Sequence, residues 1–122
     1  MVRLVTFLAT ALLLAQTPQK TAELPLNEIK LPPGFAIELY AAGVPNARQM
    51  ALGDKGTLFV GSRNARRVYA VVDRDGDKKG DQVQTIASGL ASPSGIAFRD
   101  GALYVAEISR ITRYDGIESK LD

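Results

Sequence analysis

The 122-residue chain contains no cysteine, no histidine and no tryptophan, and these absences exclude several classes of function. Zinc fingers, thiol redox centres, haem ligation by histidine and catalytic triads that use an imidazole all need residues that this sequence lacks. Hydrophobic residues make up 46% of the chain and charged residues 23%, which is typical of a folded globular chain. The length allows one small domain at most.

The first 22 residues predict a signal peptide. Arg3 precedes the apolar run Leu4–Ala15, which is too short to span a bilayer, because a helical span takes about 20 apolar residues; a buried helix is the alternative. Removing these residues deletes two of the 15 basic side chains, Arg3 and Lys20, and none of the 13 acidic ones. The mature chain is then balanced in charge, which gives no support to nucleic-acid binding. We expect an exported protein, periplasmic or extracellular, with no membrane span in its mature chain.

Residues 23–35 predict a linker, because Pro32, Pro33 and Gly34 interrupt any regular element there. Residues 36–122 predict an all-β fold, since short segments rich in Val, Ile, Leu, Phe and Tyr alternate with Asp, Gly, Asn and Ser. The expected strands are residues 36–41, 49–52, 57–61, 68–72, 83–87, 95–98, 102–106 and 111–114.

The β region contains an internal repeat. Three blocks recur in the same order at offsets of 46, 45 and 43 residues: Met50–Leu52 as Ile96–Phe98, Gly56–Val60 as Gly101–Val105, and Arg67–Tyr69 as Arg110–Thr112. A period of about 45 residues with four short strands is typical of β-propeller blades, and chance similarity between two hairpins is the alternative. Because a propeller ring closes with about four to eight blades, we expect these two blades to be the N-terminal part of a longer protein.

The same region carries a family resemblance. The matching residues are Leu31–Phe35, Val44–Arg48, Met50–Leu52, Gly56–Gly61, Gly89–Leu90, Pro93–Ile111 and Arg113–Asp115. They resemble the opening of the sorbosone dehydrogenase family, which is related to the soluble glucose and aldose sugar dehydrogenases that use pyrroloquinoline quinone (PQQ). The resemblance implies a six-bladed propeller, with PQQ and calcium as cofactors. It also implies oxidation of a sugar, or another small polyol or aldehyde, by hydride transfer to the quinone.

The resemblance places the family's catalytic base, a histidine, after residue 122, since this chain has none. No catalytic residue is therefore assigned, and we expect the 122 residues to be inactive on their own. Two other functions stay open: a non-catalytic propeller module that binds partners within a larger exported protein, and a calcium-dependent lactonase of the same architecture. The residues do not specify the electron acceptor.

Arg48, Arg63 and Ser94 are the candidate cofactor-binding residues. Strands of a blade alternate in direction, so these residues fall on the rim where the resembled family holds PQQ. PQQ carries three carboxylates, and a guanidinium can meet a carboxylate with two parallel hydrogen bonds; solvated surface arginines are the alternative. Glu107, on the same rim, is expected to pair with an arginine such as Arg48 or Arg110 rather than act as an acid or base.

Asp73, Asp75, Asp77 and Asp81 are the candidate metal ligands, in the run DRDGDKKGD. Alternating acids with a glycine resemble the first half of a calcium loop, because alternate residues of a tight turn can direct carboxylates inward. The two lysines in this run oppose a cation, and a plain hairpin turn is the alternative. Since the loop belongs to the opposite rim, an ion there is expected to be structural.

Overall fold

The computed structural model describes residues 24–121. The chain divides into two units, Met1–Ala36 and Ile37–Asp122. The described part of the first unit contains one short 3₁₀ helix, η1 (Leu26–Glu28), within the predicted linker. The predicted signal peptide, residues 1–22, lies outside the described residues.

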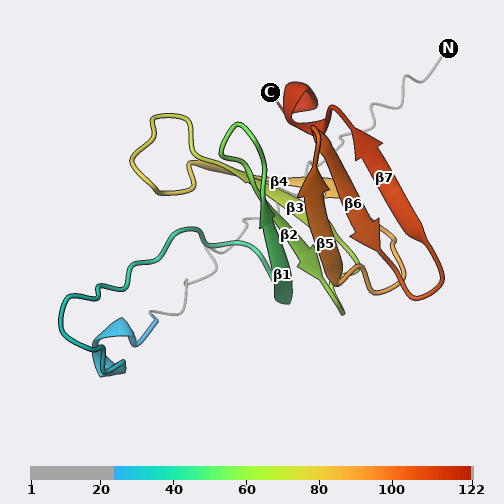
Figure 1. Cartoon of the computed structure of the whole chain (residues 1–122). Helices are drawn as coiled ribbons and strands as arrows, with labels where there is room; N and C mark the ends of the chain where they lie inside the picture. The colour runs from blue at the N-terminus through green and yellow to red at the C-terminus, as the bar shows by residue number, and fades with distance from the viewer. Residues whose placement is uncertain (1–23, 122) are drawn as a thin grey trace, which may run out of the picture. The chain divides into compact units, whose positions relative to one another are not determined.

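The second unit is all-β, as the sequence predicted (Figure 1). The first sheet has the order β1 (Ala47–Leu52), β2 (Leu58–Ser62), β3 (Val68–Val72) and β4 (Gln82–Ala87). The second sheet has the order β5 (Gly95–Arg99), β6 (Ala102–Ala106) and β7 (Ile111–Asp115), followed by the 3₁₀ helix η2 (Ile117–Lys120). All neighbouring strands are antiparallel. Apolar alternation between turn residues therefore located these seven strands to within two residues.

The strand predicted for residues 36–41 is wrong, because the structure has no strand there. The carbonyl of Tyr40 accepts a hydrogen bond from the Gly80 N–H at 2.8 Å. No ladder of such bonds joins this segment to a strand in the described part of the chain. An apolar alternating sequence becomes a strand only beside a partner, and the sequence pattern did not reveal that the partner is missing.

Each sheet has two faces, which the strand register defines because directly paired residues share a face. The front face of the first sheet carries Met50, Leu52, Leu58, Val60, Tyr69 and Val71, and its back face carries Ala51, Phe59, Gly61, Val68 and Ala70. The front face of the second sheet carries Ile96, Phe98, Leu103, Val105, Thr112 and Tyr114, and its back face carries Gly95, Ala97, Tyr104, Ala106, Ile111 and Arg113.

The main core forms where the back face of the first sheet packs on the front face of the second. The rings of Phe59 and Phe98 stack with centroids 5.6 Å apart. The buried members of this cluster are Phe59, Val68, Ala70, Leu90, Ile96, Leu103, Val105 and Ile117. Fully burying one large apolar side chain stabilises a fold by about 1.5–3 kcal/mol, so this interface holds the two sheets together.

Gly61 sets how closely the two sheets approach. A Cβ atom at this position would lie 2.6 Å from the Pro93 carbonyl oxygen and 2.6 Å from Cγ1 of Ile96. Only a residue without a side chain fits that gap. The equivalent position in the second sheet is Ala106, on a back face that no further sheet of the described chain covers.

The faces follow the internal repeat. Met50 and Leu52 correspond in the repeat to Ile96 and Phe98, and both pairs lie on front faces. Phe59 corresponds to Tyr104, and both lie on back faces. The sequence repeat is thus also a spatial repeat, in which the back of one sheet packs on the front of the next.

The front face of the first sheet is only partly covered. Val60, Tyr69 and Val71 are buried there, with Tyr40, Ala41 and Val44 packed against them. Met50 and Leu52, on the innermost strand, stay 59% and 65% exposed. The hydroxyl of Tyr69 is buried and has no hydrogen-bond partner among residues 24–121.

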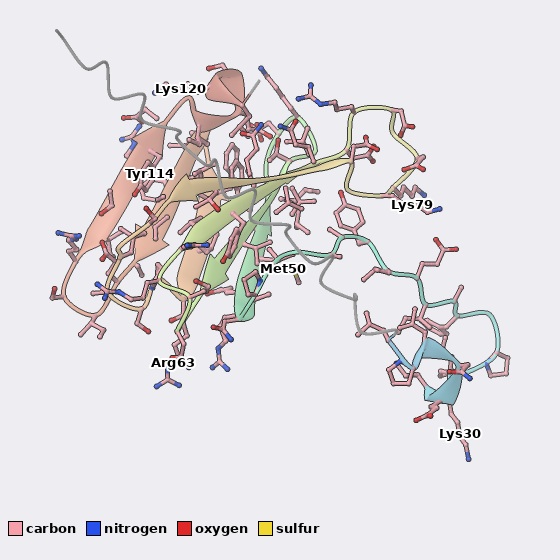
Figure 2. The ribbon with its side chains drawn as sticks, turned by 180° about the vertical axis from the view of Figure 1, so that it is seen from behind. Lys30, Met50, Arg63, Lys79, Tyr114 and Lys120 are labelled. Atoms are coloured by element: carbon pink, nitrogen blue, oxygen red, sulfur yellow. The ribbon has the colours of Figure 1, made fainter. Side chains whose placement is uncertain are left out.

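The loops gather at two ends of the sheets. One end, which we call the arginine end, holds the start of β1, the β2–β3 loop, the β4–β5 connection and the β6–β7 loop. The opposite end, the aspartate end, holds the β1–β2 turn, the β3–β4 loop, the β5–β6 turn and η2. Arg63 lies at one end and Lys120 at the other (Figure 2). Neither helix described for this chain is long and apolar enough to cross a membrane.

Candidate functional site

Arg48 is positioned by an irregularity in β1. The register with β2 passes from Ala47–Ser62 to Met50–Val60, so that Arg48 and Gln49 together lie opposite one residue of β2. A bulge of this kind redirects side chains at the end of a strand. Gln49 uses its side-chain oxygen to accept a hydrogen bond from the Ile96 N–H at 3.2 Å, which ties β1 to β5. Arg48 is exposed at the arginine end.

Arg63 lies in the β2–β3 loop, whose shape is fixed by its neighbours. The buried Ser62 hydroxyl donates to the Arg67 carbonyl at 2.6 Å and accepts from the Arg67 N–H at 2.9 Å. Arg66 takes a left-handed backbone conformation, with φ of +56°, and its guanidinium donates to the carbonyls of Gly89 and Leu90. This closed loop projects Arg63 beyond the sheet (Figure 2).

Arg48, Arg63 and Ser94 line one open hollow of about 400 Å³ at the arginine end. The complete lining is Arg48, Arg63, Ser92, Ser94, Gly95, Ala106, Glu107 and Ile108. The three residues predicted to bind a cofactor are therefore brought together from three segments: β1, the β2–β3 loop and the β4–β5 connection. In the described part of the chain neither Arg48 nor Arg63 forms an ion pair or a side-chain hydrogen bond.

Glu107 is held at the wall of this hollow, with a side chain only 1% exposed. Its carboxylate accepts hydrogen bonds from Nε of Arg110 at 2.6 Å, from Nη2 of Arg110 at 3.3 Å and from the Ala91 N–H at 2.6 Å. The Arg110 guanidinium, followed by the Ala91 N–H, holds the pKa of Glu107 below its ordinary value of 4.5. The expected pairing of Glu107 with an arginine is confirmed, and Arg110 is the partner.

The hollow therefore combines two free positive charges with one neutralised negative charge. Because Arg110 balances Glu107, the charges left for a ligand are those of Arg48 and Arg63, with hydroxyls from Ser92 and Ser94 beside them. The guanidinium of Arg66, also at this end, donates its hydrogen bonds to the backbone carbonyls of Gly89 and Leu90. This set of groups suits an anionic ligand, above all one with carboxylates.

Sequence reasoning missed Ser92 and Ile108 as lining residues of the hollow. It also missed Glu118 as a contact between the two sheets at the aspartate end. Glu118, in η2, accepts hydrogen bonds from the N–H groups of Lys55 and Thr57, in the β1–β2 turn. Two residues 63 positions apart meet there. No local pattern indicates that contact, since it depends on how the second sheet packs on the first.

The aspartate loop between β3 and β4 brings together Asp73, Asp75 and Asp81. One carboxylate oxygen of each lies within 4.8 Å of the others. Calcium takes oxygen ligands at about 2.3–2.6 Å, so these three atoms can reach a common ion. Asp77, the fourth predicted ligand, lies outside the group and accepts from the Lys79 N–H at 2.8 Å.

The same carboxylates also shape the loop. Asp73 accepts from the N–H groups of Gly76 and Lys78, and Asp81 accepts from the Arg74 N–H. Tyr40 lies near the loop, and its pKa is raised first by burial and then by the negative charges of Asp73, Asp81 and Asp77. The loop is therefore a preformed turn with a concentrated negative charge, at the end opposite the hollow.

Comparison with known proteins gives one weak similarity. No family model matches the chain. An uncharacterized protein of Borreliella burgdorferi (strain ATCC 35210 / DSM 4680 / CIP 102532 / B31) is 23% identical to it over 116 residues. The match covers 94% of this chain and 29% of that protein. The chain thus spans less than a third of the relative it matches.

Proposed function

We propose that this chain supplies two blades of a β-propeller quinoprotein, an exported sugar dehydrogenase of the sorbosone type, and that its arginine end forms part of the PQQ site. The observation that carries the proposal is the convergence of Arg48, Arg63 and Ser94 on one hollow while both arginines stay unpaired.

The propeller architecture is supported by the stacking of the sheets. Consecutive antiparallel sheets, about 45 residues apart, pack back to front with equivalent residues on equivalent faces. A propeller is built by repeating that step around an axis. The similarity to a protein more than three times as long agrees with further blades in a larger chain.

The donors around the hollow fit PQQ in charge and size. Arg48 and Arg63 would hold carboxylates of the cofactor, and Ser94 would offer a hydroxyl to it or to a sugar. A volume of about 400 Å³ lies within the range of about 300–1,000 Å³ that is usual for small-molecule sites. PQQ, when bound, supplies the two-electron acceptor of the oxidation. The chain's own residues contribute binding and orientation.

Glu107 has a supporting task in this proposal. Since its carboxylate is ionised and accepts three hydrogen bonds, it fixes the β4–β5 connection that carries Ser94. The same interactions neutralise Arg110, which leaves Arg48 and Arg63 as the charges that select an anion. Glu107 is thus a positioning residue rather than a general acid.

The proposal is tested by titrating the 122-residue chain with PQQ at low and high salt and following cofactor fluorescence. Weak binding that declines with salt is expected, because exposed charges are screened within about 10 Å at 0.1 M ionic strength. The double variant Arg48→Ala/Arg63→Ala should bind about tenfold more weakly or worse, since a hydrogen bond to a charged group is worth about 1.5–3 kcal/mol.

The matched control is Arg99→Ala, which removes one exposed arginine at the aspartate end. Arg99 pairs with Asp100 at 3.1 Å and its side chain is 82% exposed, so its loss should leave PQQ binding unchanged. Equal weakening by Arg99→Ala and by the double variant would mean that only net charge attracts the cofactor. Binding unaffected by the double variant would remove the hollow from the proposal.

A structural calcium ion in the aspartate loop is the second part of the proposal. Three carboxylate oxygens within 4.8 Å of one another fit the ligand type and spacing that calcium uses. Because the loop lies at the aspartate end, such an ion would stabilise the β3–β4 turn and stay remote from the hollow.

A further inference from the structure

We propose that copies of this chain associate head to tail, with the front face of the first sheet of one copy packed on the back face of the second sheet of the next. The inference goes beyond the proposed function, which assigns the two sheets to a propeller and the arginine end to PQQ, because it concerns contacts between separate copies of the chain. It rests on the interface between the two sheets within the chain, which supplies the template for a contact between copies.

Within the chain, the contact joins a back face to a front face at known positions. Phe59 of the back face stacks on Phe98 of the front face, and Gly61 lies against Ile96. The repeat then identifies the equivalent residues on the two faces that remain open. On the back face, Tyr104 and Ala106 are equivalent to Phe59 and Gly61. On the front face, Leu52 and Met50 are equivalent to Phe98 and Ile96.

Both open faces carry exposed apolar surface. The back face of the second sheet contains a shallow apolar hollow of about 280 Å³. It is lined by Gln49, Gly95, Ile96, Ala97, Tyr104, Ala106 and Ile111. Met50 and Leu52 project from β1 with 59% and 65% of their surface exposed (Figure 2 labels Met50). Met50 is an unbranched, flexible side chain, which suits it to fill an irregular hollow of this kind.

The outer strands give the same indication. The second sheet has three strands where the first has four, so the outer edge of β7 has no partner in the described chain. Residues 37–41 have the alternating apolar pattern of a strand and are unpaired, with Ile37 and Leu39 40% and 47% exposed. Tyr40 and Ala41 pack on the front face of the first sheet. Residues 37–41 therefore run along the front face of the first sheet. In the proposed contact, β7 of the neighbouring copy would lie on that same face.

The hydroxyl of Tyr69 also indicates that a further layer packs on the front face of the first sheet. Its hydroxyl is buried with no partner among the described residues, which costs free energy that a further layer can recover. The neighbour's β7 would carry Arg113 and Asp115 toward this side. A second copy packed on this face would therefore cover the exposed side chains of Met50 and Leu52. The same copy would account for the unpaired edge of β7 and for the unpaired hydroxyl of Tyr69.

Because the two faces differ, the association is heterologous and continues until a ring closes or a filament forms. Each copy contributes two sheets, and rings of this architecture hold about four to eight. A closed assembly would therefore contain about two to four copies.

The absence of cysteine makes a directional test possible. Met50→Cys and Ala106→Cys each introduce a single thiol on one of the two faces. Mixed and oxidised, the two variants should give a disulfide-linked heterodimer, whereas either variant alone should not, since like faces do not meet.

Light scattering on the unmodified 122-residue chain should give a mass of at least two copies. The variant Met50→Glu/Leu52→Glu should lower that mass to one copy.

Ile108→Glu is the matched control. Ile108 is an apolar residue 82% exposed in the β6–β7 loop, on neither face, so the same change there should leave the mass unaltered. A monomeric unmodified chain would overturn the proposal. So would disulfide formation by Met50→Cys alone, which requires front faces to meet. Either result leaves the PQQ titration unaffected, so the two proposals fail separately.

Discussion

At the scale of single residues, the arginine end is organised by which charges are paired. Glu107 and Arg110 neutralise each other at 2.6 Å, and Arg66 is committed to two carbonyls of the β4–β5 connection. Arg48 and Arg63 are left with their charges uncompensated beside Ser94. Of these four arginines, Arg66 and Arg110 therefore hold the fold, while Arg48 and Arg63 are available to a ligand.

Glu107→Gln should lower stability at neutral pH and flatten its dependence on acid. The folded-state pKa of Glu107 lies below the ordinary value of 4.5 because Arg110 and the Ala91 N–H bind the carboxylate. A lowered pKa means that the stabilisation is complete above pH 4.5 and is lost as the pH falls through the folded value. Urea midpoints measured between pH 7 and pH 3 should fall in the parent chain and change less in the variant.

Asp54→Asn provides the comparison for that series. Asp54 is exposed in the β1–β2 turn at the other end of the sheets, and its neutralisation should leave both the midpoint at pH 7 and the acid dependence close to those of the parent chain. If Glu107→Gln and Asp54→Asn behaved alike, Glu107 would have no particular part in holding the loops.

At the scale of elements, the spacing of the two sheets depends on Gly61. Gly61→Ala should destabilise the chain by about 1–3 kcal/mol, the usual cost of overpacking, because the new Cβ would lie 2.6 Å from the Pro93 carbonyl oxygen. That atom belongs to the backbone and cannot rotate away. Chemical denaturation followed by circular dichroism measures the loss.

Ala106→Ser tests the same repeat position in the second sheet. Since no further sheet of the described chain covers that back face, an added hydroxyl has room in a single copy, and the change in the stability of that copy should stay within about 0.5 kcal/mol. Comparable losses at positions 61 and 106 would contradict the packing described for the two sheets.

The aspartate loop permits a matched pair of substitutions. Asp75→Asn should reduce the rise in melting temperature that calcium gives, because Asp75 belongs to the carboxylate group of this loop. Asp77→Asn should preserve it, because Asp77 lies outside that group. An ion that binds only the folded state stabilises it by about 2.7 kcal/mol at one hundred times its dissociation constant. Melting curves with calcium and with a chelator measure the difference.

Two results would show that these aspartates only form the turn. One is equal destabilisation by Asp75→Asn in calcium and in chelator. The other is the absence of any calcium effect on the parent chain, whose hydrogen bonds from Gly76 and Lys78 to Asp73 already fix the loop without an ion.

The sequence predicted those elements whose pattern is local. Alternation identified β1 to β7. The alternating strand directions predicted a common rim for Arg48, Arg63 and Ser94, and these three residues line one hollow. Sequence reasoning failed for residues 36–41, where the apolar pattern is that of a strand but no strand of the described chain pairs with the segment. It could not find the contact of Glu118 with the β1–β2 turn, since that contact depends on how two sheets stack rather than on any spacing along the chain.

At the scale of the whole molecule, the two sheets surround a ligand at the arginine end on one side only and do not enclose it. The hollow at the arginine end is open, and within residues 24–121 its unpaired cationic lining consists of Arg48 and Arg63. A tricarboxylate such as PQQ needs charged groups that converge from several directions. In the proposed propeller, or in the proposed assembly of copies, further blades or further copies would place their own loops beside this hollow.

We expect that the 122-residue chain does not oxidise sugars by itself, whether single or associated. Removing a hydroxyl proton needs a positioned base whose pKa lies near the working pH, and the chain has no histidine. Among the described residues, Glu107 is the carboxylate that lines the hollow, and Arg110 holds its pKa below 4.5. At pH 7 it is ionised and already accepts three hydrogen bonds, so it is a poor base.

We therefore expect no turnover of glucose, sorbosone or other aldoses when the chain is supplied with PQQ, calcium and an artificial electron acceptor. Dye reduction above the level of free PQQ is the measurement, and Glu107→Gln is the informative variant. Robust reduction by the parent chain that disappears in Glu107→Gln would contradict the prediction, because it would make Glu107 the base despite its pairing. Assembly of copies alone should not restore activity, since each copy brings the same residues to the ring and none of them is a histidine.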